Sequence, residues 1–260
     1  MPSLPAAART LLDRSGIEVR RRGRGPRRTL PEVLTHYRRL GVAPATVIDV
    51  GVAAGTPELY DAFAGARRLL VEPLREWEPG LRAIVAAAPA GSAYELCAAG
   101  PQNGELEIGV HRVLACSSIV GDRRGDGVDV ERRVVPVRRL DDIVAASGLE
   151  GPFVVKVDTE GAELQVLAGA LDTLATTQLV LLEVSLFELN PGAAQLAEVV
   201  TWMAEHGWAV VDLYNGHLRP LDGQLAQLDM AFAPENGPLR ADHRYARPEQ
   251  ADALYRSWGL

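Results

Sequence analysis

The feature that most constrains the fold is a regular alternation of short apolar runs and amphipathic helical patterns between residues 46 and 232. We expect strands at 46–50, 67–71, 93–98, 104–110, 134–137, 153–157, 179–184, 208–213 and 228–232. We expect helices from Thr29 onward and at 57–63, 76–87, 140–146, 162–174 and 193–206. Because apolar strands that alternate with helices form sheets covered on both faces, the pattern predicts an α/β fold with a mostly parallel sheet.

Two segments flank this alternation and set the expected boundaries of a domain at 29–235. Residues 1–28 form an arm rich in arginine, which we interpret as a solvated tail, with docking to an anionic partner as the alternative. Residues 236–260 form a C-terminal extension with an expected helix at 247–258. This helix is expected to pack on the core or on a second subunit. In the second case the protein would be a homo-oligomer.

Composition narrows the range of partners. The formal net charge of -7 disfavours binding to the phosphate backbone of a nucleic acid. No apolar run is long enough to span a bilayer, and the N-terminus lacks the pattern of an export signal. The two cysteines, Cys97 and Cys116, form no CxxC pair, which is typical of reduced thiols in a cytoplasmic protein.

A glycine-containing loop follows the first expected strand. In it, Asp49, Gly51 and Gly55 have the spacing DxGxxxG, whereas a dinucleotide-binding loop would have GxGxxG. Glycines allow a sharp turn and close approach of the backbone to a ligand. An acid at this point repels a phosphate and suits a ligand that carries an ammonium and a sulfonium, such as S-adenosylmethionine. The alternative is an ordinary turn between a strand and a helix.

An acid also ends the second expected strand. Glu72 lies about twenty residues after the glycine loop, where a carboxylate can accept hydrogen bonds from both ribose hydroxyls. NAD sites and S-adenosylmethionine sites share this feature, so Glu72 alone does not separate them. A solvated acid at a strand end is the alternative.

The most distinctive stretch runs from the strand at 153–157 into a helix, with the sequence VVKVDTEGAELQVLAGA. It resembles the signature of the FkbM family of methyltransferases. Further family features occur in order, namely Asp49 and Gly51, Glu72 and Pro73, Ser117 and Ser118, residues 140–141 and residues 182–183. The resemblance covers about residues 46–185. The family usually has Gly-Ala-Asn in the first loop, whereas this chain has Gly51, Val52 and Ala53.

The resemblance implies a Rossmann-like class I methyltransferase fold with a seven-stranded sheet. It also implies transfer of a methyl group from S-adenosylmethionine to a hydroxyl of a sugar or polyketide-type natural product, that is, a small-molecule or glycan acceptor. The cofactor-binding residues expected are Asp49, Gly51, Val52, Gly55, Glu72, Pro73, Ala98, Ser118 and Asp158.

Three carboxylates are expected on the acceptor side, because an alcohol must lose its proton to a base as the new bond forms. Asp158 would take the proton, Glu160 would position the hydroxyl and Glu183 would line the same cleft. Helix capping is the alternative for Asp158, and complementing the helix dipole is the alternative for Glu160. Either His111 or His217 could serve as the base instead.

Other interpretations remain open at this point. Carboxylates at adjacent strand ends could hold Mg²⁺, although the pattern identifies no metal ligand set. Residues 114–131 are expected to form a lid over the site. An NAD-dependent oxidoreductase and a non-catalytic binding protein with the same fold are the rival functions.

Overall fold

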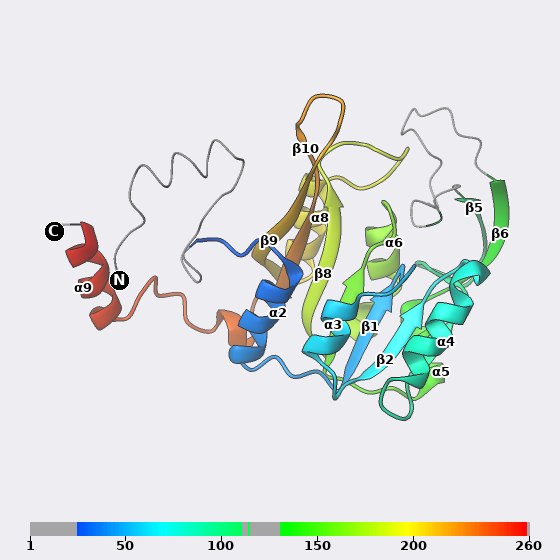
Figure 1. The fold of residues 1–260 in the computed structure, drawn as a ribbon, viewed down its shortest axis with the longest axis horizontal. Helices are drawn as coiled ribbons and strands as arrows, with labels where there is room; N and C mark the ends of the chain where they lie inside the picture. Colours follow the sequence, from blue (N-terminus) through cyan, green and yellow to red (C-terminus); the bar gives the residue numbers. More distant parts are fainter. Residues whose placement is uncertain (1–24, 111–113, 115–130, 259–260) are drawn as a thin grey trace, which may run out of the picture.

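A central sheet of seven strands crosses the molecule in the order β3-β2-β1-β7-β8-β10-β9 (Figure 1). The structure is a computed structural model, which describes residues 25–110, 114 and 131–258. The strands are β1 (Thr46–Val50), β2 (Arg67–Val71), β3 (Ala93–Glu95), β7 (Phe153–Val157), β8 (Thr177–Ser185), β9 (Trp208–Leu218) and β10 (Leu225–Pro234). β10 pairs antiparallel with β8 and β9, and the other pairs are parallel. The predicted mostly parallel seven-stranded α/β fold is confirmed.

Helices cover both faces of this sheet. The helices α2 (Leu30–Arg39), α3 (Pro57–Ala62) and α4 (Glu78–Ala86) share one core with the sheet. The helices α5 (Leu140–Ser147), α6 (Glu163–Ala168), α7 (Leu171–Leu174) and α8 (Leu196–Glu205) share the other. Figure 1 shows α2 and α3 in front of the sheet and α8 behind it. Alternation along β1 explains both layers, because Val47 joins the first core and Ile48 the second.

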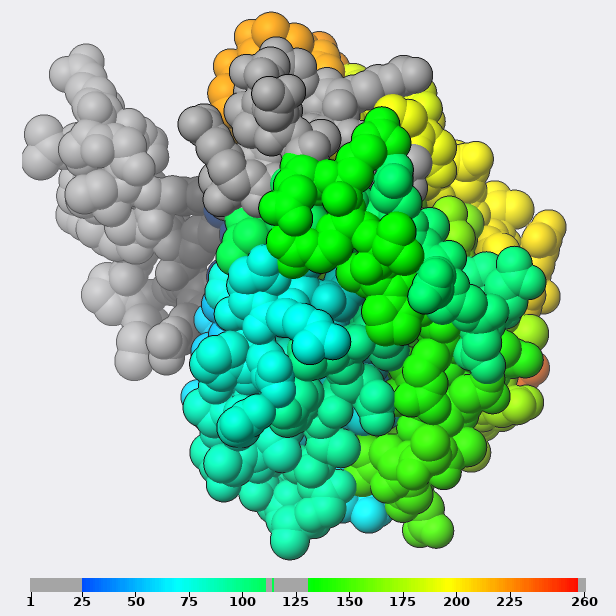
Figure 2. Space-filling view, turned by 90° about the vertical axis from the view of Figure 1, so that its right-hand side faces the viewer, coloured from blue at the N-terminus to red at the C-terminus, as the bar shows by residue number. Residues whose placement is uncertain are grey.

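A small second sheet contains β4 (Ala98–Ala99), β5 (Gly104–Val110) and β6 (Glu131–Arg138), in the order β4-β6-β5. The expected single strand at 93–98 was therefore wrong, because β3 pairs with β2 whereas β4 pairs with β6. Figure 2 shows β6 beside the segment that follows β2. An ion pair of 2.7 Å between Arg133 and Glu76 connects these two segments.

The expected single helix at 162–174 was also wrong, because α6 and α7 are separate helices. The chain at Gly169 approaches the backbone of another segment very closely. A Cβ atom at Gly169 would lie 2.0 Å from the carbonyl oxygen of Gly100. The Gly169 carbonyl oxygen accepts a hydrogen bond of 3.0 Å from the amide of Asp141 instead of continuing the helix.

The C-terminal extension contains a 3-10 helix, η3 (Pro238–Arg240), and the expected terminal helix, α9 (Pro248–Trp258). Figure 1 places α9 at the margin of the molecule, beyond α2. Within the described part of the chain, no helix combines the length and apolar character that crossing a bilayer requires.

Candidate active site

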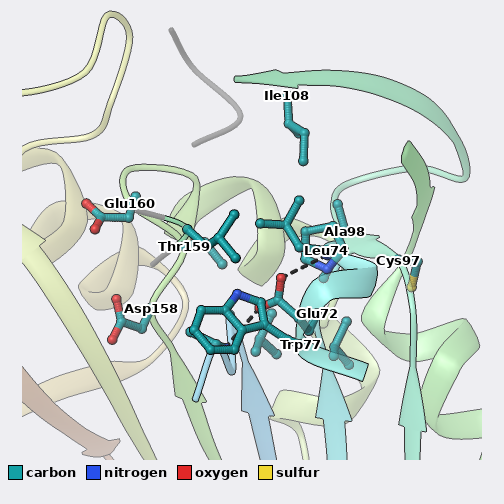
Figure 3. A pocket seen from close by; sticks show the side chains of 16 residues that line it. Glu72, Leu74, Trp77, Cys97, Ala98, Ile108, Asp158, Thr159 and Glu160 are labelled. Carbon is teal, nitrogen blue, oxygen red and sulfur yellow. Dashed lines mark hydrogen bonds between the residues drawn. The ribbon is translucent and has the colours of Figure 1, made fainter. Parts of the chain in front are cut away.

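A cavity lies at the carboxyl ends of β1, β2 and β7, bordered by the small sheet (Figure 3). It encloses about 580 Å³ of empty space, part of which is open to solvent. The predicted site residues in its wall are Gly51, Glu72, Pro73, Ala98, Asp158 and Glu160. Residues from three strand ends therefore meet at one cavity, as expected for an α/β sheet.

The glycine loop packs closely against the turn that follows β7. Gly51 has φ of +76°, and a Cβ atom there would lie 1.8 Å from the carbonyl oxygen of Asp158. Gly55 has φ of +95°, and its Cβ atom would lie 2.7 Å from the Ile84 side chain. Only glycine fits the space and the backbone angle at Gly51. The loop from β1 and the turn after β7 are thereby in direct contact.

Glu72 is buried, and its carboxylate is fixed by two backbone amides. The amide of Ala53 donates to Oε2 at 3.0 Å, and the amide of Leu74 donates to Oε1 at 2.9 Å. Burial raises the pKa of Glu72, while these two hydrogen bonds act in the opposite direction. Each carboxylate oxygen can accept more than one hydrogen bond, so Glu72 can still receive the hydroxyls of a ligand.

Asp49 lies behind the glycine loop rather than in the cavity wall. Its side chain is completely buried and accepts a hydrogen bond of 2.5 Å from the Tyr60 hydroxyl. The Nζ atom of Lys156 is 3.8 Å from Asp49 Oδ1 and 2.9 Å from Asp158 Oδ2. Burial raises the pKa of Asp49, opposed first by Lys156 and then by Tyr60. Direct contact of Asp49 with a ligand stays a prediction.

The turn after β7 is held in an uncommon backbone conformation. Glu160 has φ of +56°, which is rare for a residue with a side chain and is often found at functional sites. The Asn190 amide donates to the Glu160 carbonyl oxygen at 2.8 Å. The Glu163 carboxylate accepts hydrogen bonds from the amides of Thr159 and Gly161, at 3.0 and 3.1 Å. Glu163 therefore fixes the turn from inside, while Asp158 and Glu160 border the cavity.

Glu183 lies two residues before the end of β8, directly after the last pair with β7, and is joined by an acid that sequence reasoning missed. Asp229 of β10 pairs with Glu183 in the sheet register. Burial, followed by the charge of Asp158, raises the pKa of Glu183 to about 9. Burial also raises the pKa of Asp229 to about 6. An isolated aspartate within an apolar strand was the available signal for Asp229.

The other predicted site residues, Val52 and Ser118, are not among the described residues of the cavity wall. Val52 is buried in the core that includes α2 and α3, and it does not line the cavity. Ser118 lies outside the described residues, as does most of the expected lid at 114–131. Magnesium finds no support, since the described residues contain no group of three or more His, Cys, Asp or Glu side chains suited to a metal ion.

Several wall residues were not identified from the sequence. Trp77 comes from the 3-10 helix η1 (Arg75–Trp77), and Figure 3 shows its indole beside Glu72. Cys97, directly before β4, and Ile108, within β5, add apolar surface. Burial raises the pKa of the Cys97 thiol to about 11. The tryptophan that follows Glu72 and Pro73 by a few residues was the one usable signal.

A family model described as the methyltransferase FkbM domain matches residues 45–208, which is more than half of the chain. No protein with a curated description matches the sequence.

Solved structures with a distantly similar fold include three methyltransferases. They are a precorrin-6y C5,15-methyltransferase from Geobacter metallireducens, a magnesium protoporphyrin IX methyltransferase from Synechocystis with S-adenosylmethionine bound, and the N-methyltransferase NodS from Bradyrhizobium japonicum. In that order, the sequence identities are 11%, 8% and 10%, and the TM-scores are 0.41, 0.42 and 0.42. The alignments cover 83%, 79% and 78% of this chain and 93%, 76% and 94% of the other chains.

Proposed function

The chain belongs to the FkbM family of methyltransferases, and we propose that it transfers a methyl group from S-adenosylmethionine to a hydroxyl of a sugar or polyketide-type natural product. Membership of the family establishes a methyltransferase. The cofactor, the oxygen nucleophile and the class of acceptor are the parts that we propose.

The residues of the cavity fit this cofactor. The positive φ of Gly51 lets the chain turn sharply after β1 beside the cavity, and the Glu72 carboxylate matches a pair of ribose hydroxyls. Trp77 and Ile108 supply apolar surface of the kind that a purine base requires. Asp49 and Asp158 share the single cation of Lys156, which favours a cationic ligand over a pyrophosphate.

The acceptor side follows from the chemistry of the reaction. S-adenosylmethionine supplies a methyl group that is already bound to a cationic sulfur, so the protein must mainly align an oxygen and remove its proton. Asp158 borders the cavity, and Lys156 holds one of its two carboxylate oxygens. We assign proton removal to the other oxygen of Asp158. Glu160 orients the hydroxyl from the adjacent position, and Glu183 lines the acceptor side at the next strand.

The observation that carries this proposal is the continuous wall from Glu72 to Asp158, with the glycine loop between them. The experiment is transfer of tritium from methyl-labelled S-adenosylmethionine to panels of methyl glycosides and hydroxylated macrolactones. Asp158→Asn is expected to bind the cofactor as the wild type does and to lose at least 100-fold in turnover. Asp61→Asn, at an exposed acid of α3, is the matched control and should retain turnover.

Undiminished turnover in Asp158→Asn would remove Asp158 from the mechanism. Label found on nitrogen or carbon rather than in a methyl ether would contradict the proposed O-methylation.

A further inference from the structure

Four polar side chains form a row across neighbouring strands. Asp158 directly follows the last paired residues of β7 and β8, which are Val157 and Leu182. Glu183 follows Leu182 and pairs with Asp229 on β10. Asp229 in turn pairs with Tyr214 on β9. The row therefore begins at Asp158 in the cavity wall and runs away from the cavity along the sheet.

Alternation along the strands places this row on one face of the sheet. The residues two positions away from Glu183 and Asp229, which are Leu181 and Ala231, both belong to the core that contains α2 and α3. Tyr214 belongs to the same core. Side chains two positions apart on a strand share a face, so Glu183 and Asp229 lie on this face as well.

Glu183 and Asp229 form what we call the carboxylate pair. Directly opposed residues of antiparallel strands have Cβ atoms about 5 Å apart. Gln227 donates to Glu183 Oε2 at 2.8 Å, and Asn215 donates to Asp229 Oδ2 at 2.8 Å. Asn215 has φ of +47°, and the β9–β10 register shifts between Gln227 and Asp229, so local backbone distortion accompanies this contact. Each acid is only partly buried and keeps a second oxygen for a proton.

The surroundings favour one proton on the carboxylate pair near neutral pH. Burial raises the pKa of both acids, to about 9 for Glu183 and about 6 for Asp229. The charged or titratable groups that act on the pair come from three places: Lys156 from β7, Asp158, Glu160 and Glu163 from the turn and helix that follow it, and Tyr214 and His217 from β9. Lys156 already lies between Asp158 and Asp49, so its charge is divided among several acids.

We propose that the carboxylate pair receives the proton that the acceptor hydroxyl releases, and that Asp229 is the group that takes it up. This inference rests on the proposed function. In the reaction the acceptor O–H bond breaks, an O–CH₃ bond forms, and the methyl–sulfur bond breaks with its electrons left on sulfur. The proton passes to Asp158 and from there to the carboxylate pair, where Glu183 already carries one proton.

The charges balance within the site. Methyl transfer removes the positive charge of the sulfonium, and the released proton replaces it a short distance away. Strands are spaced about 4.8 Å apart, so a cation beside Asp158 lies within about 10 Å of Asp229. At an effective dielectric constant of about 20, a unit charge at that distance changes proton affinity about tenfold. The pair should therefore bind a proton more tightly when S-adenosylhomocysteine replaces S-adenosylmethionine.

Isothermal calorimetry tests this linkage without knowledge of the acceptor. Each ligand is titrated into the full-length protein at pH 6 in buffers of different ionisation enthalpy, which gives the protons taken up per ligand bound. At pH 6 the α-ammonium group is charged in both ligands. At this pH we expect S-adenosylhomocysteine to take up about 0.4 proton more than S-adenosylmethionine.

Three variants locate the proton. Asp229→Asn keeps an acceptor for Asn215 but cannot ionise. In this variant the two ligands should take up equal numbers of protons at pH 6. Glu183→Gln mimics the protonated acid and should retain the difference. Asp222→Asn removes an exposed carboxylate from the same hairpin and should also retain it.

Equal proton uptake for the two ligands in the wild type would overturn the inference while leaving the proposed function intact. A difference that persists in Asp229→Asn would assign the proton to another group and would equally overturn it. If the protein bound neither ligand, the proposed function itself would fail. The wild-type comparison decides the matter even if Asp229→Asn does not fold.

Discussion

Substitution of Gly51 tests the central contact of the site, between the glycine loop and the turn after β7. In Gly51→Ala, the new methyl group would lie 1.8 Å from the carbonyl oxygen of Asp158, so backbone has to move. The positive φ of +76° adds about 1–2 kcal/mol for a residue with a side chain. Displacement of packed backbone adds about 1–3 kcal/mol. We expect the free energy of unfolding to fall by about 2–5 kcal/mol in total.

Gly148→Ala is the matched control. Gly148 has φ of +63°, but apart from its chain neighbours no residue comes within 4 Å of the position of its Cβ atom. This variant bears the conformational cost alone, about 1–2 kcal/mol. Urea denaturation measures both stabilities, and calorimetry measures the affinity for S-adenosylhomocysteine. Gly51→Ala should weaken binding at least tenfold, whereas Gly148→Ala should leave it unchanged. Equal effects of the two substitutions on stability and binding would refute the steric argument.

Two further substitutions probe the buried charges. Lys156→Met leaves Asp49 buried without its cation and should lower the free energy of unfolding at pH 7 by about 3–5 kcal/mol. Burial already raises the pKa of Asp49, so ionisation of Asp49 destabilises the fold as pH rises above about 4, the pKa of an aspartate in the unfolded chain. The loss of stability in Lys156→Met should therefore become smaller as pH falls toward 4. Urea denaturation at several pH values across this range measures it. Glu72→Gln replaces a carboxylate that accepts two amide hydrogen bonds and should weaken binding of S-adenosylhomocysteine at least tenfold in calorimetry; unchanged binding would exclude Glu72 from the cofactor site.

The sequence was sufficient to predict the residues at the ends of the parallel strands. Gly51, Glu72 and Asp158 each follow a short apolar run, and the carboxyl ends of such strands meet at one edge of the sheet. Local pattern alone therefore placed these three residues at a common cavity.

Residues whose positions depend on distant pairing were harder to predict. Ala98 and Ala99 pair with a segment more than thirty residues later, so the expected strand at 93–98 did not show its division. Asp229 reaches Glu183 through an antiparallel strand with register shifts, which apolar periodicity does not reveal. Asp49 was expected near the ligand, yet its hydrogen bond to Tyr60 and its burial come from the packing of α3.

The most direct test of the proposed cofactor is a calorimetric titration of the full-length protein with S-adenosylmethionine, S-adenosylhomocysteine and NAD. The structure combines a glycine loop without the GxGxxG spacing, a buried acid behind it and Glu72 at the end of β2. We therefore expect both S-adenosyl compounds to bind with one-to-one stoichiometry and NAD to give no binding signal. Binding of NAD without either S-adenosyl compound would contradict the account.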